Sequence, residues 1–273
     1  MRCTHEANLG LGVAILSSTK VHLPDVTLIA VASLNIDETH AALLYSAQHI
    51  NFGAVKLLCS MSPTTTDGRI QYLPIPPIDY IGYQRFMLES LGTYVQTDHC
   101  LVIQADGFVL EPTRWSRQFL EYDYIGAPWP AVLSFSTTRG DRLSLPLEKN
   151  TVGNGGFSLR SKRLLEATSR KRFDSLNFPC NVEDVLICHY LYDEMRASGI
   201  QFAPPEIAAL FSIETDLGLR GHSFDSVFGF HGKHWLVDAW KRTGLNQIRG
   251  TRRNQACPCG SGRKYKHCCG ARR

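Results

Sequence analysis

Three predominantly apolar runs, separated by helical patterns, dominate the first 107 residues and constrain the fold most. The runs are "VTLIAVASL" (26–34), "AVKLLCS" (54–60) and "HCLVIQADG" (99–107). Strands that are apolar without alternation are buried on both faces, as in parallel sheets covered by helices. The helical stretches between them, 38–50 and 80–95, complete the βαβ rhythm. We therefore expect an α/β fold whose mostly parallel mixed sheet carries helices on both faces, with ligands at the carboxyl ends of its strands.

Weaker patterns outline the rest of the chain. Asp37, or less favourably Asn35, is expected to cap the first helix. The proline-rich stretch 70–78 indicates an edge strand, and 133–150 is predicted to be a polar linker. In the second half of the chain the sequence predicts a short strand in 122–130, a helix over 183–198 and a strand over 227–235.

Charge and cysteine are concentrated at the carboxyl end. Eight of the 29 Lys and Arg residues follow residue 248, and no acidic residue lies among them. The rest of the chain therefore has 21 basic and all 25 acidic residues. The body is thus mildly acidic, which argues against a nucleic-acid-binding main domain. We predict a main domain over 20–240, a linker over 241–254 and a separate module over 255–271.

The chain before the basic tail gives expectations about compartment. No apolar run approaches the roughly 20 residues that span a bilayer, and no export signal is evident. Five scattered cysteines are expected to be free, buried thiols, as in a reducing compartment: Cys3, Cys59, Cys100, Cys180 and Cys188. These features predict a cytoplasmic protein.

The stretch "TVGNGGFSLRSKRLL" (151–165) is unusually rich in glycine. Gly153, Gly155 and Gly156 either turn a loop or leave the backbone bare so that a ligand can approach it closely. On the second interpretation Phe157 and Leu159 anchor the loop in the core. Gly155→Val should then abolish ligand binding with little loss of fold.

Polar residues at the ends of predicted elements are candidates for chemistry. Gln104, Asp106 and Gly107 follow a buried strand, where a carboxylate can hold a divalent ion or simply form an Asp-Gly turn. Glu183 and Asp184 begin a helix, either as residues favoured by its dipole or as a general base.

Three further side chains carry two interpretations each. His231, in "FGFHG", is either structural or a ligand for Mn²⁺ or another first-row ion. Trp129 either packs in the core or offers its face to a sugar ring. Arg160 is either a solvated helix residue or a contact for phosphate.

Over about residues 20–235 the chain resembles a glycosyltransferase-like family of the GT-A kind. Five stretches, taken in order, carry the resemblance: "QADG", "YDYIGAPWP", "VGNGGFSLRS", "VEDV" and "FGFH". The resemblance implies a GT-A-like (Rossmann-like) fold and a nucleotide-sugar donor held with Mn²⁺ or Mg²⁺. Asp106 matches the last acid of the family's D-x-D signature, but Gln104 stands where its first acid would be. His231 matches a late metal-binding histidine, and Glu183 or Asp184 the base of inverting members.

By the same resemblance, the glycine cluster matches the loop beneath the transferred sugar. Asn154 could hydrogen-bond the hydroxyls of that sugar. The implied donor-binding residues are Gln104, Asp106, Gly107, Trp129, Asn154, Gly155, Gly156 and Arg160.

The tail "ACPCGSGRKYKHCCG" (256–270) spaces four cysteines as C-x-C-x8-C-C. Cys257, Cys259, Cys268 and Cys269 suit a tetrahedral zinc ion that would supply the folding energy of so short a piece, with His267 an alternative to Cys269. The tail resembles the SEC-C motif, which implies docking to a protein partner, and its basic residues suit an acidic protein or the ribosome.

Three functions remain open from the sequence. The leading hypothesis is a glycosyltransferase that moves a sugar from a nucleotide-sugar donor to a hydroxyl of an unknown acceptor. The alternatives are a catalytically inactive sugar- or nucleotide-binding adaptor, for which Gln104 would mark lost catalysis, and a nucleotidyltransferase.

Overall fold

The computed structural model describes residues 20–136, 141–243, 245 and 264. Its centre is a six-stranded sheet of order β3-β2-β1-β4-β10-β5. The first four strands in this order run parallel, whereas β10 is antiparallel to both β4 and β5. The strands are β1 (Val21–Ala32), β2 (Ile50–Cys59), β3 (Gln71–Pro74), β4 (His99–Val102), β5 (Tyr124–Ile125) and β10 (Ser158–Ser161). The predicted mixed, mostly parallel sheet is confirmed.

Six further strands form three two-stranded sheets beside it. β6 (Ala127–Pro128) pairs with β9 (Val152–Gly153), and β11 (Ser212–Ile213) with β12 (Gly229–Phe230). β7 (Val132–Ser136) and β8 (Arg142–Pro146) form an antiparallel hairpin where the sequence predicts a linker. In this hairpin Leu133 and Leu145 are register partners, so the apolar residues that we assigned to a linker pack across two strands.

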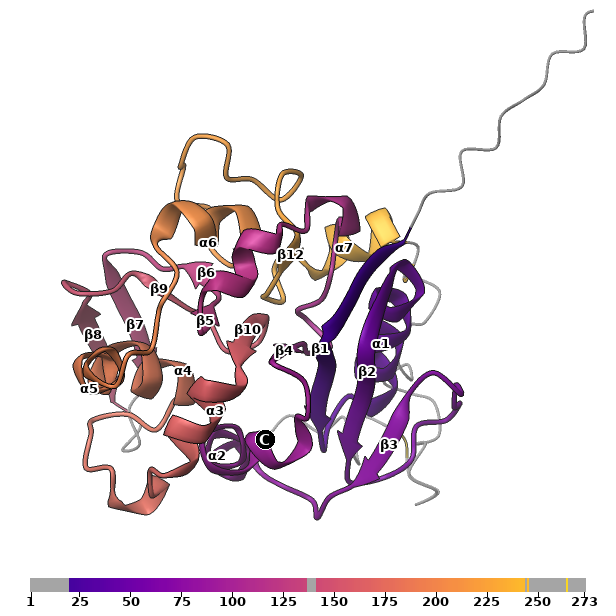
Figure 1. The fold of residues 1–273 in the computed structure, drawn as a ribbon, viewed down its shortest axis with the longest axis horizontal. Helices are drawn as coiled ribbons and strands as arrows, with labels where there is room; N and C mark the ends of the chain where they lie inside the picture. Colours follow the sequence, from indigo (N-terminus) through magenta and orange to yellow (C-terminus); the bar gives the residue numbers. More distant parts are fainter. Residues whose placement is uncertain (1–19, 137–140, 244, 246–263, 265–273) are drawn as a thin grey trace, which may run out of the picture.

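Helices cover both faces of the sheet, as predicted (Figure 1). The α-helices are α1 (Ile36–His49), α2 (Tyr80–Arg85), α3 (Lys162–Ser169), α4 (Glu183–Val185), α5 (Tyr192–Ala197), α6 (Pro205–Phe211) and α7 (Leu236–Thr243). π-helical turns continue α2 and α4 at η1 (Phe86–Ser90) and η6 (Leu186–Tyr190). The 3₁₀ helices are η2 (Leu91–Tyr94), η3 (Pro112–Arg114), η4 (Arg117–Glu121) and η5 (Phe173–Ser175).

Alternate residues of the central strands enter different cores, because successive strand side chains point to opposite faces. Leu28 of β1 packs with Leu43 of α1 on one face. Its neighbour Ile29 packs with Met87 of η1 and Leu165 of α3 on the other. Both faces of β1 are therefore buried, which is why its sequence is apolar without alternation.

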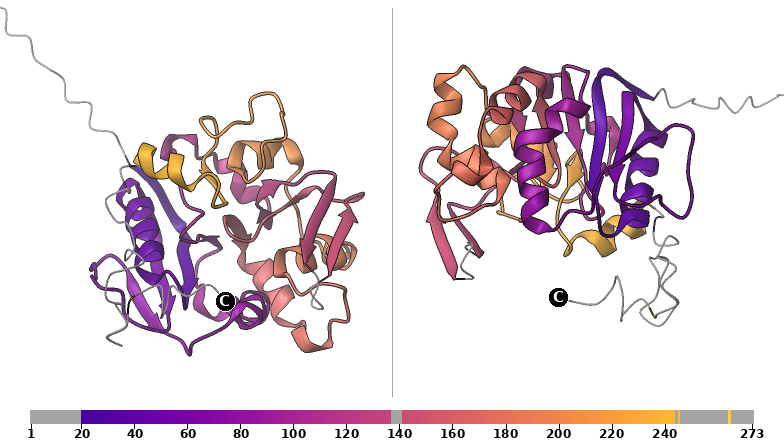
Figure 2. Two further views of the ribbon diagram at one scale, coloured as in Figure 1. Left: turned by 180° about the vertical axis from the view of Figure 1, so that it is seen from behind. Right: turned by 90° about the horizontal axis from the view of Figure 1, so that it is seen from below.

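A third core holds the second half of the chain together. Leu186 and Met195 pack there, and Leu133, Phe135 and Leu145 of the β7–β8 hairpin lie against the same cluster. Figures 1 and 2 place this hairpin at the opposite side of the molecule from β2 and β3.

Local details correct some of the expectations. The N-cap of α1 is Asn35, in the left-handed conformation, and not Asp37, whose carboxylate instead accepts from Thr64. The strand predicted over 227–235 is only two residues long. Cys59, Cys100, Cys180 and Cys188 are free and buried as predicted, while Cys3 lies outside the described residues.

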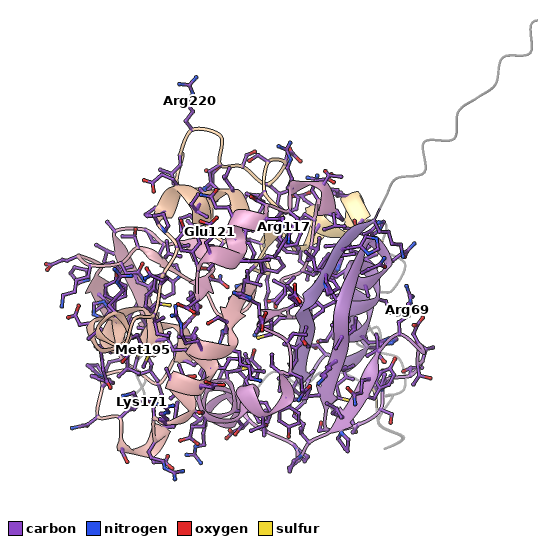
Figure 3. All side chains as sticks on the ribbon, in the orientation of Figure 1. Arg69, Arg117, Glu121, Lys171, Met195 and Arg220 are labelled. Atoms are coloured by element: carbon purple, nitrogen blue, oxygen red, sulfur yellow. The ribbon has the colours of Figure 1, made fainter. Side chains whose placement is uncertain are left out.

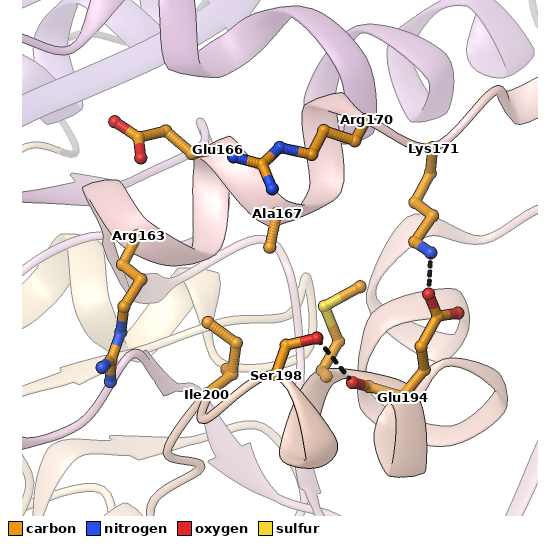
Figure 4. Close-up of a pocket in the computed structure, with 9 residues that line it drawn as sticks. Arg163, Glu166, Ala167, Arg170, Lys171, Glu194, Ser198 and Ile200 are labelled. Atoms are coloured by element: carbon orange, nitrogen blue, oxygen red, sulfur yellow. Dashed lines mark hydrogen bonds and ion pairs between the residues drawn. The ribbon is translucent and has the colours of Figure 1, made fainter.

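Two surface features lie apart from the sheet edge. The loop between β11 and β12 carries Arg220 away from the body at its tip (Figure 3). A cavity of about 260 Å³ lies between α3 and α5, where Lys171 pairs with Glu194 (Figure 4). None of the predicted site residues lines this cavity.

Candidate functional site

The candidate site lies where β4 ends and four other segments meet it. The chain leaves β4 into a tight turn in which the backbones of Gln104 and Gly107 bond to each other. The backbone N–H of Gly232, just after β12, donates to the carbonyl of Asp106 at 2.8 Å. This bond fixes the segment of His231 against the strand-terminal turn, at the edge where ligands of such sheets bind.

His231 is the centre of the cluster. Its Nε2 lies 3.3 Å from Gln104 Oε1 and 3.9 Å from Asp106 Oδ1. Its Nδ1 lies 2.9 Å from Asn154 Nδ2 and 3.3 Å from Glu214 Oε1. The structure therefore brings together residues from four distant segments, three of which the sequence singles out only one by one.

Asn154 shapes the glycine-rich loop through its own backbone and side chain. It has a φ of 69°, in the left-handed region that asparagine tolerates better than most residues. Its Oδ1 accepts from the backbone N–H of Gly156 at 2.9 Å and of Phe157 at 3.2 Å. Because both bonds use the oxygen, the amide nitrogen must face His231.

The three glycines of this loop leave room for protein side chains. A Cβ on Gly153 would lie 2.1 Å from the Trp129 ring, and one on Gly156 would lie 2.1 Å from His231 Nε2. A Cβ on Gly155 would lie 2.6 Å from a Glu183 carboxylate oxygen. The expectation that bare backbone serves ligand approach is therefore corrected, because protein atoms fill the space at all three positions.

Gly155→Val should consequently unfold the protein more readily. The added side chain collides with a buried carboxylate, and such overpacking costs about 1–3 kcal/mol or more. We expect a fall of several degrees in the melting temperature, measured by calorimetry. Gly68, whose Cβ would meet nothing within 4 Å, offers the matched control Gly68→Val. Equal melting temperatures for the two variants would contradict this account and restore the expectation of an intact fold.

Asp184 lies beside the same loop at the start of α4. Its Oδ2 accepts from the backbone N–H of Gly155 at 2.7 Å, and its Oδ1 from that of Val185 at 2.7 Å. Burial raises the pKa of Asp184 to about 7, and the neighbouring charge of Glu183 acts in the same direction. A carboxyl with this pKa can accept a proton near neutral pH.

Glu183 and Arg160 form a buried ion pair behind the loop. The Arg160 side chain has no exposed surface, and its guanidinium donates to Glu183 and to the carbonyl of Gly155. This burial does not agree with the expectation that Arg160 contacts the donor's phosphate. It also removes Glu183 from among the bases that could reach an acceptor, since its carboxylate is occupied by Arg160.

Two other predicted donor contacts are occupied by protein groups. Gln104 Nε2 donates to Tyr83 Oη at 2.7 Å while its Oε1 faces His231. Trp129 is buried against Gly153. Of the two interpretations of this residue, the structure therefore agrees with packing in the core.

Three functional neighbours were missed from the sequence. Tyr83 and Gln84 of α2 contact Gln104 and the backbone N–H of Glu183, respectively. Glu214 follows β11. Burial acts to raise the pKa of its carboxyl, but hydrogen bonds, the strongest of them from His231, outweigh burial and lower the pKa. Tyr83 and Gln84 belong to a stretch predicted to be helical, but nothing in the sequence says which strand end that helix meets.

Glu214 also governs the charge of His231. Burial acts to lower the pKa of His231, but the hydrogen bond and charge of Glu214 outweigh it, so that the pKa is raised. The site therefore combines an imidazole of increased basicity with the carboxyl of Asp106.

The donor atoms at the end of β4 fit a divalent cation. Ligands of one Mg²⁺ ion at about 2.1 Å stand about 3 Å apart. Gln104 Oε1 lies 3.3 Å from His231 Nε2, close to that separation, whereas Asp106 Oδ1 lies farther away at 3.9 Å. Oxygen with imidazole is a donor set that Mn²⁺ accepts. Within 20–136, 141–243, 245 and 264, no group of three or more His, Cys, Asp or Glu could hold a metal. In the cluster at the end of β4 the third donor, beside Asp106 and His231, is the amide oxygen of Gln104.

The zinc cysteines predicted in the tail lie outside the described residues. In the part of the chain that the structure describes, no helix combines the length and apolar character that a membrane span needs.

Fold and site together define a mixed α/β protein with a polar cluster at the carboxyl edge of its sheet. The family model "Protein of unknown function (DUF5672)" matches residues 71–231, and the chain belongs to this family. The SEC-C motif model matches residues 253–271. No curated protein is significantly similar in sequence.

Solved structures with similar folds include two glycosyltransferases. The galactosyltransferase LgtC, in complex with donor and acceptor sugar analogues, is 13% identical with a TM-score of 0.46, over 81% of this chain and 94% of that one. GlyE of Streptococcus pneumoniae TIGR4 is 12% identical with a TM-score of 0.44, over 80% and 59%. The bifunctional IspDF of Campylobacter jejuni is 10% identical with a TM-score of 0.40, over 66% and 48%.

Proposed function

We propose that this protein is a glycosyltransferase that moves a sugar from a nucleotide-sugar donor to an acceptor hydroxyl. The observation that carries the proposal is the gathering of Gln104, Asp106 and Asn154 around the His231 ring, with Asp184 bonded to the residue after Asn154. A base with a pKa near 7 beside side chains that could hold a cation suits the displacement of a diphosphate.

In the proposed mechanism Asp184 accepts the proton of the acceptor hydroxyl. The hydroxyl oxygen forms a bond to the anomeric carbon, and the bond from that carbon to the diphosphate breaks, the diphosphate taking the electron pair. Asn154 directs its amide hydrogens towards the site and orients a donor hydroxyl. Gln104, Asp106 and His231 would hold a divalent ion, whose charge would stabilise the diphosphate when bound.

The tail and the main domain have separate roles in this proposal. The four cysteines Cys257, Cys259, Cys268 and Cys269 hold zinc, and the folded tail docks to a protein or ribosomal partner. The main domain, which α7 extends beyond the predicted boundary of 240 to Thr243, carries the transfer reaction in the cytoplasm. The residues between it and the tail join the two.

Ligand-dependent melting and turnover test the function. A nucleotide sugar at a hundredfold excess over its Kd stabilises the protein by about 2.7 kcal/mol, which raises the melting temperature by several degrees. We expect this shift for one nucleotide sugar in a panel measured with and without Mn²⁺, and release of its nucleoside diphosphate. Asp106→Ala should lose the shift, whereas Asp193→Ala, at an exposed ion pair of α5, should keep it.

The alternatives give other outcomes of the same experiment. A melting shift without turnover would favour the binding adaptor. Pyrophosphate release from a nucleoside triphosphate would favour a nucleotidyltransferase. A panel with no shift and no turnover would contradict the proposal.

A further inference from the structure

His231 has conflicting neighbours at Nδ1. Asn154 Nδ2 can only donate, because the Asn154 oxygen already accepts two backbone N–H groups. Its contact at 2.9 Å therefore suits a neutral ring with the hydrogen on Nε2. The Glu214 carboxylate, 3.3 Å from the same nitrogen, can only accept and suits the hydrogen on Nδ1. The two neighbours favour opposite tautomers.

Only one of these tautomers can bind a cation at the strand end. The Nε2 atom faces Gln104 Oε1 and Asp106 Oδ1, and it offers a lone pair to a cation only when the hydrogen is on Nδ1. A carboxylate that accepts from the far nitrogen is the usual device for fixing a metal-binding histidine in that form.

We propose that Glu214 is a positioning residue that selects the cation-binding tautomer of His231, in competition with Asn154. This inference deepens the proposed function and depends on it. A cation on Nε2 would require the hydrogen on Nδ1, where the Glu214 carboxylate can accept it. The Asn154 amide would then lose its acceptor on the ring.

The surroundings of Glu214 suit this role and allow a clean test. Its backbone carbonyl accepts from Trp235 Nε1 at 2.9 Å, so a side-chain substitution leaves that anchor in place. The Glu214 side chain is about three-tenths exposed, and Gln has nearly the same volume. Glu214→Gln is therefore expected to fold, which its melting temperature checks.

The experiment measures binding of Mn²⁺ alone to the full chain, from the electron paramagnetic resonance signal of the free ion. Loss of a carboxylate behind a metal-binding histidine costs about 10–100-fold in affinity. We expect a loss of at least about tenfold in Glu214→Gln and loss of the site in His231→Ala. Asn154→Asp replaces the competing donor by an acceptor, so adding it to Glu214→Gln should recover most of the affinity.

Nitrogen-15 spectra of the histidine rings give a readout that a merely structural role would not change. In metal-free Glu214→Gln we expect His231 to carry its hydrogen on Nε2, and in the double variant on Nδ1. Equal Mn²⁺ affinity of the wild type and Glu214→Gln would overturn the inference, as would failure of the wild type to bind Mn²⁺. Neither result would decide the proposed function, because sugar turnover is measured separately.

Discussion

Asp184→Asn is expected to lower kcat by about 10²–10⁴-fold, the contribution usually made by a general base. The substitution removes the proton acceptor while keeping the shape of the side chain. One of the two backbone N–H groups that Asp184 now binds, those of Gly155 and Val185, would lose its acceptor. The expected result is thus a loss of turnover with the donor-induced melting shift retained. The measurement is the rate of nucleoside diphosphate release at saturating donor.

The pH profile provides the control for this result. Since the base acts in its ionised form and its pKa is about 7, kcat/KM of the wild type should rise about tenfold per pH unit below 7 and level off above it. Asp184→Asn should lack this rise. Retention of turnover within tenfold of the wild type, or an unchanged pH profile, would contradict the assignment of Asp184 as the base.

Glu183→Gln is expected to lower the free energy of unfolding by about 3–5 kcal/mol, the usual cost of removing one partner of a buried ion pair. The substitution leaves the Arg160 guanidinium charged and enclosed, with the Gly155 carbonyl and Ser158 hydroxyl as its polar contacts. The Arg160 side chain has no exposed surface through which water could compensate. Urea unfolding of the variant and the wild type measures the difference.

An exposed ion pair of the same chain is the matched control. Lys149 and Asp193 pair with side chains that are 60% and 69% exposed, and pairs of this kind contribute about 0–1 kcal/mol. Asp193→Ala should therefore unfold within about 1 kcal/mol of the wild type. Similar losses in the two variants would mean that Arg160 and Glu183 do not form the enclosed pair described here.

The sheet could be predicted because its signal is local. Each buried strand, such as 26–34, carries enough apolar residues in a row to reveal two covered faces, and the intervening helices require parallel connections. The hairpin of β7 and β8 was missed because its strands are mostly exposed, and exposed strands resemble polar linkers in composition.

The sequence identified individual residues of the candidate site but not their arrangement in space. Strand-terminal and helix-initial positions drew attention to Asp106, Asp184 and His231, but their contacts depend on how distant segments pack. The same limit explains Arg160, whose charge suggests a surface position, because its partner Glu183 is 23 residues away and meets it only through tertiary packing. Glu214 has no local pattern at all.

Gln104 and His231 touch although they lie 127 residues apart in the chain. During synthesis, the cluster around His231 therefore cannot assemble until everything up to β12 has left the ribosome and docked beside β4. Chains that stop short of this point accordingly lack the cluster.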